Sequence, residues 1–145
     1  MKEQKLESDL CARLPYGLKV SVAVKEDNGQ ETWLTGTLKA AERCGEKFAF
    51  TVCLIDETTG KEVDCYPLKA RDIKPYLRHF DDMTKWEKAW MLVIKREPNQ
   101  KENEIMGELL RFCNINHVDY NGMIEDGQAI RVTDKNNPYN EKQNK

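Results

Sequence analysis

Apolar and polar residues alternate along the first half of the chain. Every second residue is apolar within residues 18–24, and the same period returns at residues 48–54, which is typical of strands with one buried face. Two further strands are predicted at residues 32–39 and 61–66, because turns containing Asn or Gly separate them from their neighbours. The pattern therefore predicts an antiparallel meander of four strands that curls into a small barrel or is covered on its apolar face.

Helical spacing replaces this alternation in the second half. Thr84 and Glu87 match a capping box, in which each residue satisfies an amide of the other, so a helix is predicted over residues 85–95. Its apolar side chains, which we expect to face the core, are Trp86, Ala89, Trp90 and Val93. A second helix is predicted over residues 102–114, and residues 129–132 favour a last short strand.

These elements predict an α+β fold class: an antiparallel four-stranded meander or small curled barrel, followed by two helices and a short last strand. One or two helical turns over residues 7–14 precede the strands. We assign a single domain to residues 1–132, β-rich over 17–78 and helical over 84–126, because a chain of 145 residues has the size of one domain. Residues 133–145 hold few apolar side chains and are expected to form a disordered polar tail.

Composition adds little to this layout. Apolar residues make up 39% of the chain and charged residues 33%, a balance typical of a folded domain with a solvated surface. The net charge of −2 creates no large field that would attract polyanions. The chain has no apolar run long enough for a membrane helix, and its charged opening does not match a signal peptide. We expect a cytoplasmic protein with no membrane partner.

Cysteine and histidine are the residues with most potential for chemistry. Five cysteines at irregular spacing favour reduced thiols over a disulfide framework. Cys113 and His117 are four residues apart, so they can share a helix face as a nucleophile and base, but burial of the thiol explains them more simply. A zinc site would combine these two with Cys53 and Cys65, although no close cysteine pair exists. We predict no catalytic residue, no metal ligand and no cofactor, and therefore no enzyme.

One basic and aromatic stretch, residues 66–79, remains as a candidate contact surface. The predicted partner-binding residues are Tyr66, Arg71, Lys74, Tyr76 and Arg78. Interleaved aromatic and basic side chains can bind a protein partner, or can stack bases and contact phosphates. The structural alternative is an edge strand protected by its charges. In that case Tyr76 packs under the helix and Arg78 pairs with Asp81 or Asp82.

Three segments together resemble a family of small uncharacterised proteins from phages and mobile elements of gut Bacteroidota. They are residues 9–17 (DLCARLPYG), residues 73–78 (IKPYLR) followed by Met83 and Thr84, and residues 116–124 (NHVDYNGMI). The chain departs from the family at residues 79–82, where the family has a proline and a serine-rich turn. It also departs at residues 85–90, where the family has an acidic run. The resemblance implies a source and an overall layout, and it supplies no catalytic residue.

The resulting expectation is a non-enzymatic accessory or interaction protein of phage or mobile-element origin. It would act by binding another macromolecule, with a protein as the expected partner. The alternative is a nucleic-acid-binding small β-barrel that uses residues 66–79.

Overall fold

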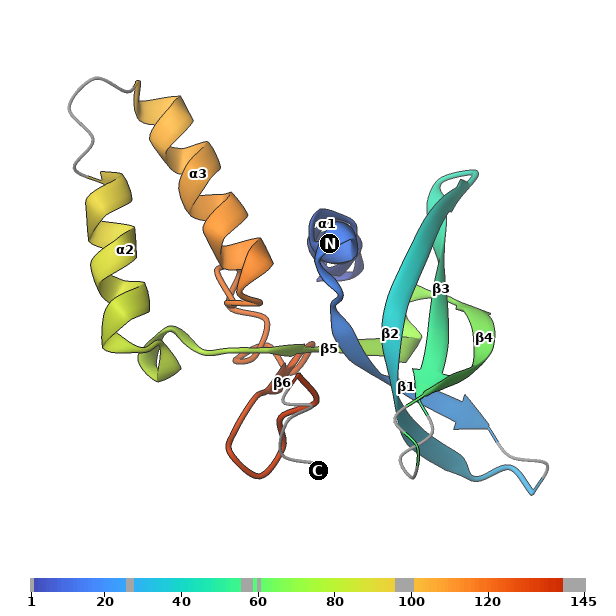
Figure 1. The fold of residues 1–145 in the computed structure, drawn as a ribbon. Helices are drawn as coiled ribbons and strands as arrows, with labels where there is room; N and C mark the ends of the chain where they lie inside the picture. Colours follow the sequence, from blue (N-terminus) through green and yellow to red (C-terminus); the bar gives the residue numbers. More distant parts are fainter. Residues whose placement is uncertain (1, 26–27, 56–58, 60, 96–100, 140–145) are drawn as a thin grey trace.

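Six strands and three α-helices make up the described part of the protein (Figure 1). The computed structural model describes residues 2–25, 28–55, 59, 61–95 and 101–139. The helices are α1 (Lys2–Arg13), α2 (Lys85–Lys95) and α3 (Glu102–Ile115); the strands are β1 (Lys19–Lys25), β2 (Glu31–Cys44), β3 (Lys47–Ile55), β4 (Glu62–Leu68), β5 (Ile73–Leu77) and β6 (Ile130–Arg131). Three short 3₁₀ turns, η1 (Leu14–Tyr16), η2 (Ala70–Asp72) and η3 (Phe80–Asp82), join these elements.

The strands form one mixed, open sheet in the order β4-β3-β2-β1-β5-β6. The pairs from β1 to β4 are antiparallel, as the predicted meander requires, and β5 also runs antiparallel to β1. The sixth strand pairs with β5 in parallel. The fold is therefore α+β as predicted. The described sheet has six strands: β1 to β4 form the predicted meander, β6 lies at the predicted last strand, and β5 was not predicted.

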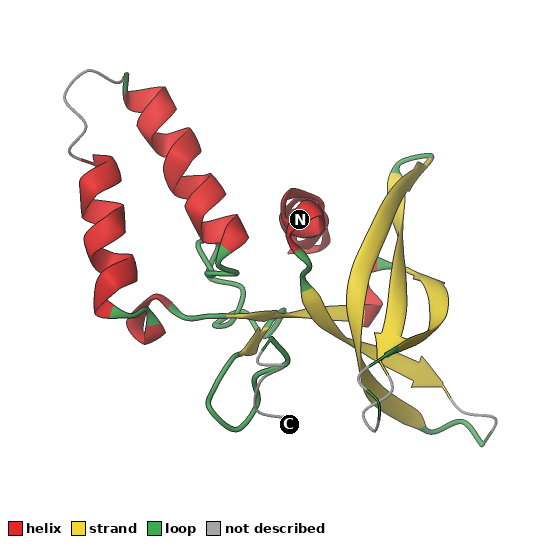
Figure 2. Cartoon of the chain, in the orientation of Figure 1, coloured by secondary structure: helices red, strands yellow, loops and turns green. Residues whose placement is uncertain are grey.

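The alternating residues point where the sequence predicts. Leu18, directly before β1, and Val20 and Val22 on β1 are fully buried, and so are Phe50 and Val52 on β3. Helix α1 covers this apolar face, because its Leu6 and Leu10 lie one turn apart and belong to the same core cluster. Figure 2 shows α1 end-on between the sheet and α3. This corrects the expectation of only one or two helical turns at residues 7–14. Met123 and Ala129, from the second half of the chain, belong to the same cluster.

Gly36 allows β2 and β3 to approach closely. A Cβ atom at this position would lie 2.5 Å from Cγ1 of Val52 and 3.0 Å from the carbonyl oxygen of Cys53, so any side chain would force the strands apart. Two residues further on, the register of β2 shifts between Leu38 and Ala40. Such a bulge increases strand twist, and it lets β2 continue as a curved strand to Cys44.

Strand β5 belongs to the stretch 66–79, for which the structural alternative was an edge strand, and it lies between β1 and β6 instead. Its backbone pairs Val22 with Ile73 and Val20 with Pro75 on one side, and Tyr76 with Ile130 on the other. Proline within a strand argues against a central position, since it lacks the N–H group. Here Pro75 is the last residue paired with β1, where the loss of a donor interrupts the ladder least.

The C-terminal residues that the structure describes are held against the sheet. Thr133 and Asn136 form an antiparallel bridge. The Tyr139 hydroxyl donates to the carbonyl of Tyr76 (2.8 Å) and accepts from the amide of Lys19 (3.0 Å). The predicted disordered tail from residue 133 is thus wrong for residues 133–139, because one aromatic side chain anchors them; residues 140–145 lie outside the described residues.

Cys53 is disulfide-bonded, which corrects the prediction of reduced thiols at this position. Cys11 and Cys113 are free, as predicted for them.

Among the helices that the structure describes, none combines the length and the apolar character needed to cross a bilayer.

Candidate interaction surface

Tyr76 does not lie on the surface. It is only 7% exposed, because β5 sits between β1 and β6 and both faces of the strand are covered. Its backbone carbonyl also accepts the hydrogen bond from Tyr139. The expected surface position of Tyr76 is therefore corrected, and the structural alternative of a packed ring is closer to the observed position.

Arg78 is engaged within the chain rather than free for a partner. Its guanidinium donates to both carboxylate oxygens of Glu87, at 2.6 and 2.5 Å, and also to the carbonyl of Asn116. The hydrogen bonds from Arg78 hold the pKa of Glu87 at about 2. The alternative partners proposed from sequence were Asp81 and Asp82, but Asp82 accepts two hydrogen bonds from Arg131 instead.

The other three predicted contact residues do not complete a surface. The ammonium of Lys74 lies 5.3 Å from the centroid of the Trp33 ring, so it is directed along the sheet. Arg71 is exposed on η2, and the side chain of Tyr66 lies outside the described residues. Among the described side chains of residues 67–79, the aromatic and basic ones are thus not gathered on one exposed face.

An apolar stripe on α2 is exposed instead. Trp86 is 77% exposed, Trp90 49% and Val93 55%, and their spacing of four and three residues places them on one helix face together with Ala89. We call these four residues the α2 stripe. The sequence predicted them to face the core, but only Ile94 of this helix is buried. The reason is that α2 and α3 stand away from the sheet (Figure 1), so α2 packs against α3 and, through Met91, against Met83 and Val118 at the base of the hairpin.

A groove extends the α2 stripe toward α3. Its volume is about 250 Å³, and it is lined by Trp90, Ile94, Glu108, Arg111, Phe112 and Ile115. Met106 and Leu110 of α3 are also exposed, as is Ile115. The exposed apolar residues therefore belong to both helices of the pair, which we call the α2–α3 hairpin.

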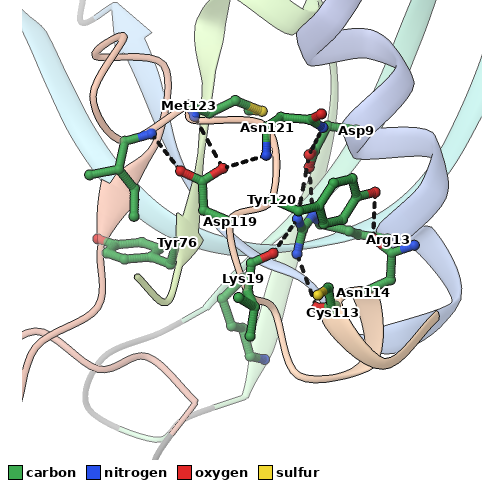
Figure 3. Close-up of polar contacts among 12 residues, drawn as sticks. Asp9, Arg13, Lys19, Tyr76, Cys113, Asn114, Asp119, Tyr120, Asn121 and Met123 are labelled. Atoms are coloured by element: carbon green, nitrogen blue, oxygen red, sulfur yellow. Dashed lines mark hydrogen bonds and ion pairs between the residues drawn. The ribbon is translucent and has the colours of Figure 1, made fainter. Parts of the chain in front are cut away.

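Arg13 fixes the base of this hairpin. The side chains of Arg13 and Asp9 have almost no contact with solvent, and they form an ion pair with Nε 2.5 Å from Oδ1. Arg13 also donates to the carbonyls of Val118 (2.6 Å) and of Cys113, the latter at the end of α3 (Figure 3). Helix α1, which lies on the sheet, is thereby joined to α3.

The loop after α3 closes around this ion pair. Asn121 donates to the second carboxylate oxygen of Asp9 at 2.7 Å, and the Tyr120 ring lies under the Arg13 guanidinium (Figure 3). The Asp119 carboxylate accepts from the amides of Asn121, Met123 and Ile124. A buried charge pair is tolerated only when its remaining hydrogen bonds are satisfied, and these residues satisfy them.

The three segments that carry the family resemblance meet at this place. Arg13 of the first segment binds the carbonyl of Val118 in the third. Arg78, at the end of the second segment, donates its amide to the carbonyl of His117 and accepts from the amide of Asp119. The pattern therefore corresponds to a structural junction between the sheet and the hairpin.

Cys113 and His117 do not have the electrostatics of a nucleophile and base. Burial raises the pKa of the Cys113 thiol, although Arg13 and Lys95 oppose this. Burial, together with the charges of Arg13, Arg78 and Lys19, lowers the pKa of His117 to about 4. The His117 ring is stacked on Tyr139, with centroids 4.2 Å apart. A reactive thiolate requires a lowered thiol pKa, which is the opposite of what this site supplies.

Within the part of the chain that the structure describes, no three His, Cys, Asp or Glu side chains cluster as metal ligands would. Comparison with known proteins adds no assignment: no family model, no curated protein and no solved structure matches this chain. The resemblance to phage and mobile-element proteins stays a prediction.

Proposed function

We propose that this chain is a non-enzymatic accessory protein that acts by binding another protein through the α2 stripe. The observation that carries the proposal is the exposure of Trp86, Trp90 and Val93 along a single helix face. Soluble monomers seldom expose contiguous apolar patches unless a partner covers them. Tryptophan is also among the residues most enriched at the energetic centres of protein interfaces.

The anchoring of the hairpin supports this role. Arg13 binds the end of α3, and Arg78 binds Glu87 in the first turn of α2. The base of α3 is thus bound to α1, which packs on the sheet, and the base of α2 is bound to Arg78, which directly follows β5. A rigidly held surface loses less conformational entropy on binding than a mobile one, so these contacts favour recognition by the hairpin.

The proposed origin of the chain in a phage or mobile element rests on the sequence resemblance alone.

The nucleic-acid alternative has less support than the protein partner. Tyr76 is buried, and the guanidinium of Arg78 is bound to Glu87. Both of these side chains would have been needed for stacking and phosphate contacts.

Affinity capture tests the proposal. The bait is the tagged chain, offered to host lysate in two arms, one with and one without nuclease. Wild type is compared with the double variant Trp86→Ala/Trp90→Ala and with the control Trp33→Ala, which removes an exposed tryptophan from the sheet. We expect wild type and the control to retain the same protein, and the double variant to lose it.

The captured protein is then titrated against all three baits by calorimetry, with circular dichroism to show that each is folded. Retention of the partner by the double variant would overturn the α2 stripe as the binding surface. Capture that disappears with nuclease in every bait would favour the nucleic-acid alternative.

A further inference from the structure

A hollow lies on the face of α2 opposite the α2 stripe. Its volume is about 370 Å³, and it is bounded by η3 and α2. The residues that line it from α2 are three, four and seven positions apart and so share one helix face: Lys88, Met91, Leu92 and Lys95. Successive residues of a helix are turned by about 100°, which places Lys88 about 200° around α2 from Trp86. We call this site the η3–α2 hollow.

The lining of the η3–α2 hollow is apolar between its charged ends. Phe80 of η3 is 41% exposed and Leu92 of α2 is 49% exposed, whereas Met83 is buried and Met91 is half-buried. Because Phe80 and Leu92 stay open to solvent, the hollow does not enclose a small ligand as a small-molecule pocket does. Methionine side chains adapt to irregular shapes, so the hollow suits an apolar side chain of a larger partner.

Positive charge dominates the η3–α2 hollow. Lys88 and Lys95 are exposed, and neither belongs to an ion pair among the described residues. The acidic residue in the lining is Asp81, at the η3 end, where its carboxylate lies 3.4 Å from Nδ1 of His79 and its side chain is 82% exposed. Solvent therefore screens Asp81 strongly. Electrostatic complementarity favours a partner that brings carboxylates to the two lysines.

The spacing of the two lysines favours a helical partner. Seven residues along α2 correspond to a rise of about 10.5 Å. Carboxylates seven residues apart on a second helix have the same separation, and the residues three and four positions after the first carboxylate share their face. In an extended chain, side chains on one face repeat about every 6.6 Å, so neither one repeat nor two match the lysines.

We propose that the η3–α2 hollow binds an acidic amphipathic helix of a protein partner. Two carboxylates of that helix, seven residues apart, pair with Lys88 and Lys95, and an apolar side chain between them enters the hollow beside Leu92. The hollow and the α2 stripe lie on opposite faces of the helix, so a partner on one leaves the other accessible. The inference therefore goes beyond the proposed function and does not rest on it.

Peptide display on the full chain tests the proposal. The probe is a library of random peptides of about 16 residues, which is long enough for four helical turns. Peptides enriched on wild type are labelled and titrated by fluorescence anisotropy against wild type and three variants. Lys88→Glu/Lys95→Glu reverses the charge of the hollow, and the matched control Lys69→Glu/Lys135→Glu reverses two exposed lysines outside it. Trp86→Ala/Trp90→Ala alters only the α2 stripe.

We expect enriched peptides with Asp or Glu seven residues apart and an apolar residue between them. Their affinity for Lys88→Glu/Lys95→Glu should fall at least about tenfold, because two attractive charge pairs become repulsive. The other two variants should bind as wild type does. Replacing both acidic residues of the peptide with lysine should restore binding to the charge-reversed variant, which a loss caused by misfolding would not allow.

The proposal is overturned if no acidic peptide is enriched, or if acidic peptides bind Lys88→Glu/Lys95→Glu as tightly as wild type. It is also overturned if a proline at the centre of the peptide, which breaks a helix, leaves the affinity unchanged. Acidic peptides that lose binding only to Trp86→Ala/Trp90→Ala would support the α2 stripe and remove the hollow. Lysine-dependent peptides, together with a Trp86→Ala/Trp90→Ala bait that keeps every captured protein, would support the hollow and overturn the proposed function.

Discussion

Arg13 is a charged side chain without solvent contact, and its partners come from both ends of the chain. Replacing it with alanine would leave the buried Asp9 carboxylate without its counter-charge and two carbonyls without a donor. We expect Arg13→Ala to lower the free energy of unfolding by about 3–5 kcal/mol, measured by urea denaturation. The control Arg43→Ala removes an exposed arginine and should change the free energy of unfolding by less than about 0.5 kcal/mol. A loss below 1 kcal/mol for Arg13→Ala would contradict the structural role.

His117 makes stability depend on acid. Its folded pKa of about 4 lies below the ordinary value of 6.5, so the unfolded chain binds a proton that the folded chain does not. Stability is therefore complete above about pH 6.5 and falls as the pH drops toward 4, by up to about 3 kcal/mol.

The measurement is the free energy of unfolding as a function of pH, for wild type and for His117→Asn. Asparagine tolerates the positive φ of 58° at this position. The variant should lose the slope between pH 6.5 and 4. Glu87, whose pKa is lowered, contributes stability that is lost only as the pH falls from about 4.5 to 2, so its effect lies in a separate window. If the free energy of unfolding of His117→Asn depends on pH between 6.5 and 4 as it does in wild type, His117 is not the residue that causes this dependence.

Some single-residue contacts could be predicted from the sequence. The capping box is confirmed, since Thr84 Oγ1 accepts from the amide of Glu87 and Glu87 accepts from the amide of Thr84. These partners are three residues apart, so local spacing determines them. Arg78 and Tyr76 were misjudged because their partners, Glu87 and Tyr139, depend on how distant segments pack.

Helix α2 owes its orientation to the pair formed by Arg78 and Glu87. A double-mutant cycle with Arg78→Ala and Glu87→Ala isolates their interaction from the loss of each side chain. We expect a coupling energy of about 1–2 kcal/mol, because the pair is bidentate and partly buried. The matched control is the exposed pair of Asp82 and Arg131, which should show no measurable coupling because solvent screens it. Equal coupling energies in the two cycles would show that partial burial does not strengthen the interaction between Arg78 and Glu87.

The C-terminal residues hold to the sheet through Tyr139. Tyr139→Phe keeps the ring stacked on His117 but removes the hydrogen bonds to Tyr76 and Lys19. It should cost about 1 kcal/mol in thermal or urea unfolding, and Tyr139→Ala should cost more because the stacked ring is lost as well. Tyr16→Phe serves as the control tyrosine and should be nearly neutral. If both phenylalanine variants unfold alike, residues 133–139 contribute no measurable anchoring.

Elements were predictable where a local period marks them. The alternation on β1 and β3 and the spacing on α2 and α3 located four elements close to their observed bounds. Strand β5 was missed because Pro75 argues against a central strand, and because its partner β1 lies more than 50 residues away in the sequence. The run of five apolar residues from Trp90 to Ile94 did carry a signal, since five successive residues cannot all face one side of a helix.

At the scale of the whole molecule, two apolar clusters of unequal size hold the chain together. The larger joins α1 to the inner face of the sheet, and the smaller consists of Met83, Cys113 and Val118 at the base of the hairpin. Regions with few buried apolar contacts open at lower free energy than the main core. Native-state hydrogen exchange at low protein concentration should therefore show α2 amides opening well below the global free energy of unfolding, and β1 and β3 amides only near it. Equal protection of α2 and β1 would show one cooperative unit.

The overall layout could be predicted in outline, whereas the exposed surface could not. The change of period near residue 80 predicts that β1 to β4 precede α2 and α3. The sequence does not reveal that α1, together with Met123 and Ala129, covers the sheet, and this leaves α2 with an uncovered face. Trp86 and Trp90 were assigned to the core because large aromatic residues are usually buried, and only the position of α1 removes that assignment.

The contacts of Arg13 also set an order on the folding of the growing chain. Helix α1 and strands β1 to β4 have all been synthesised once Leu68 is added, so this part can assemble early. Val118 follows Arg13 by 105 residues, which at about 5–20 residues per second means a wait of roughly 5–20 s. Asp9 stands one helical turn from Arg13 and is available from the start. It therefore neutralises the guanidinium in the nascent helix until the carbonyls from the far end of the chain arrive.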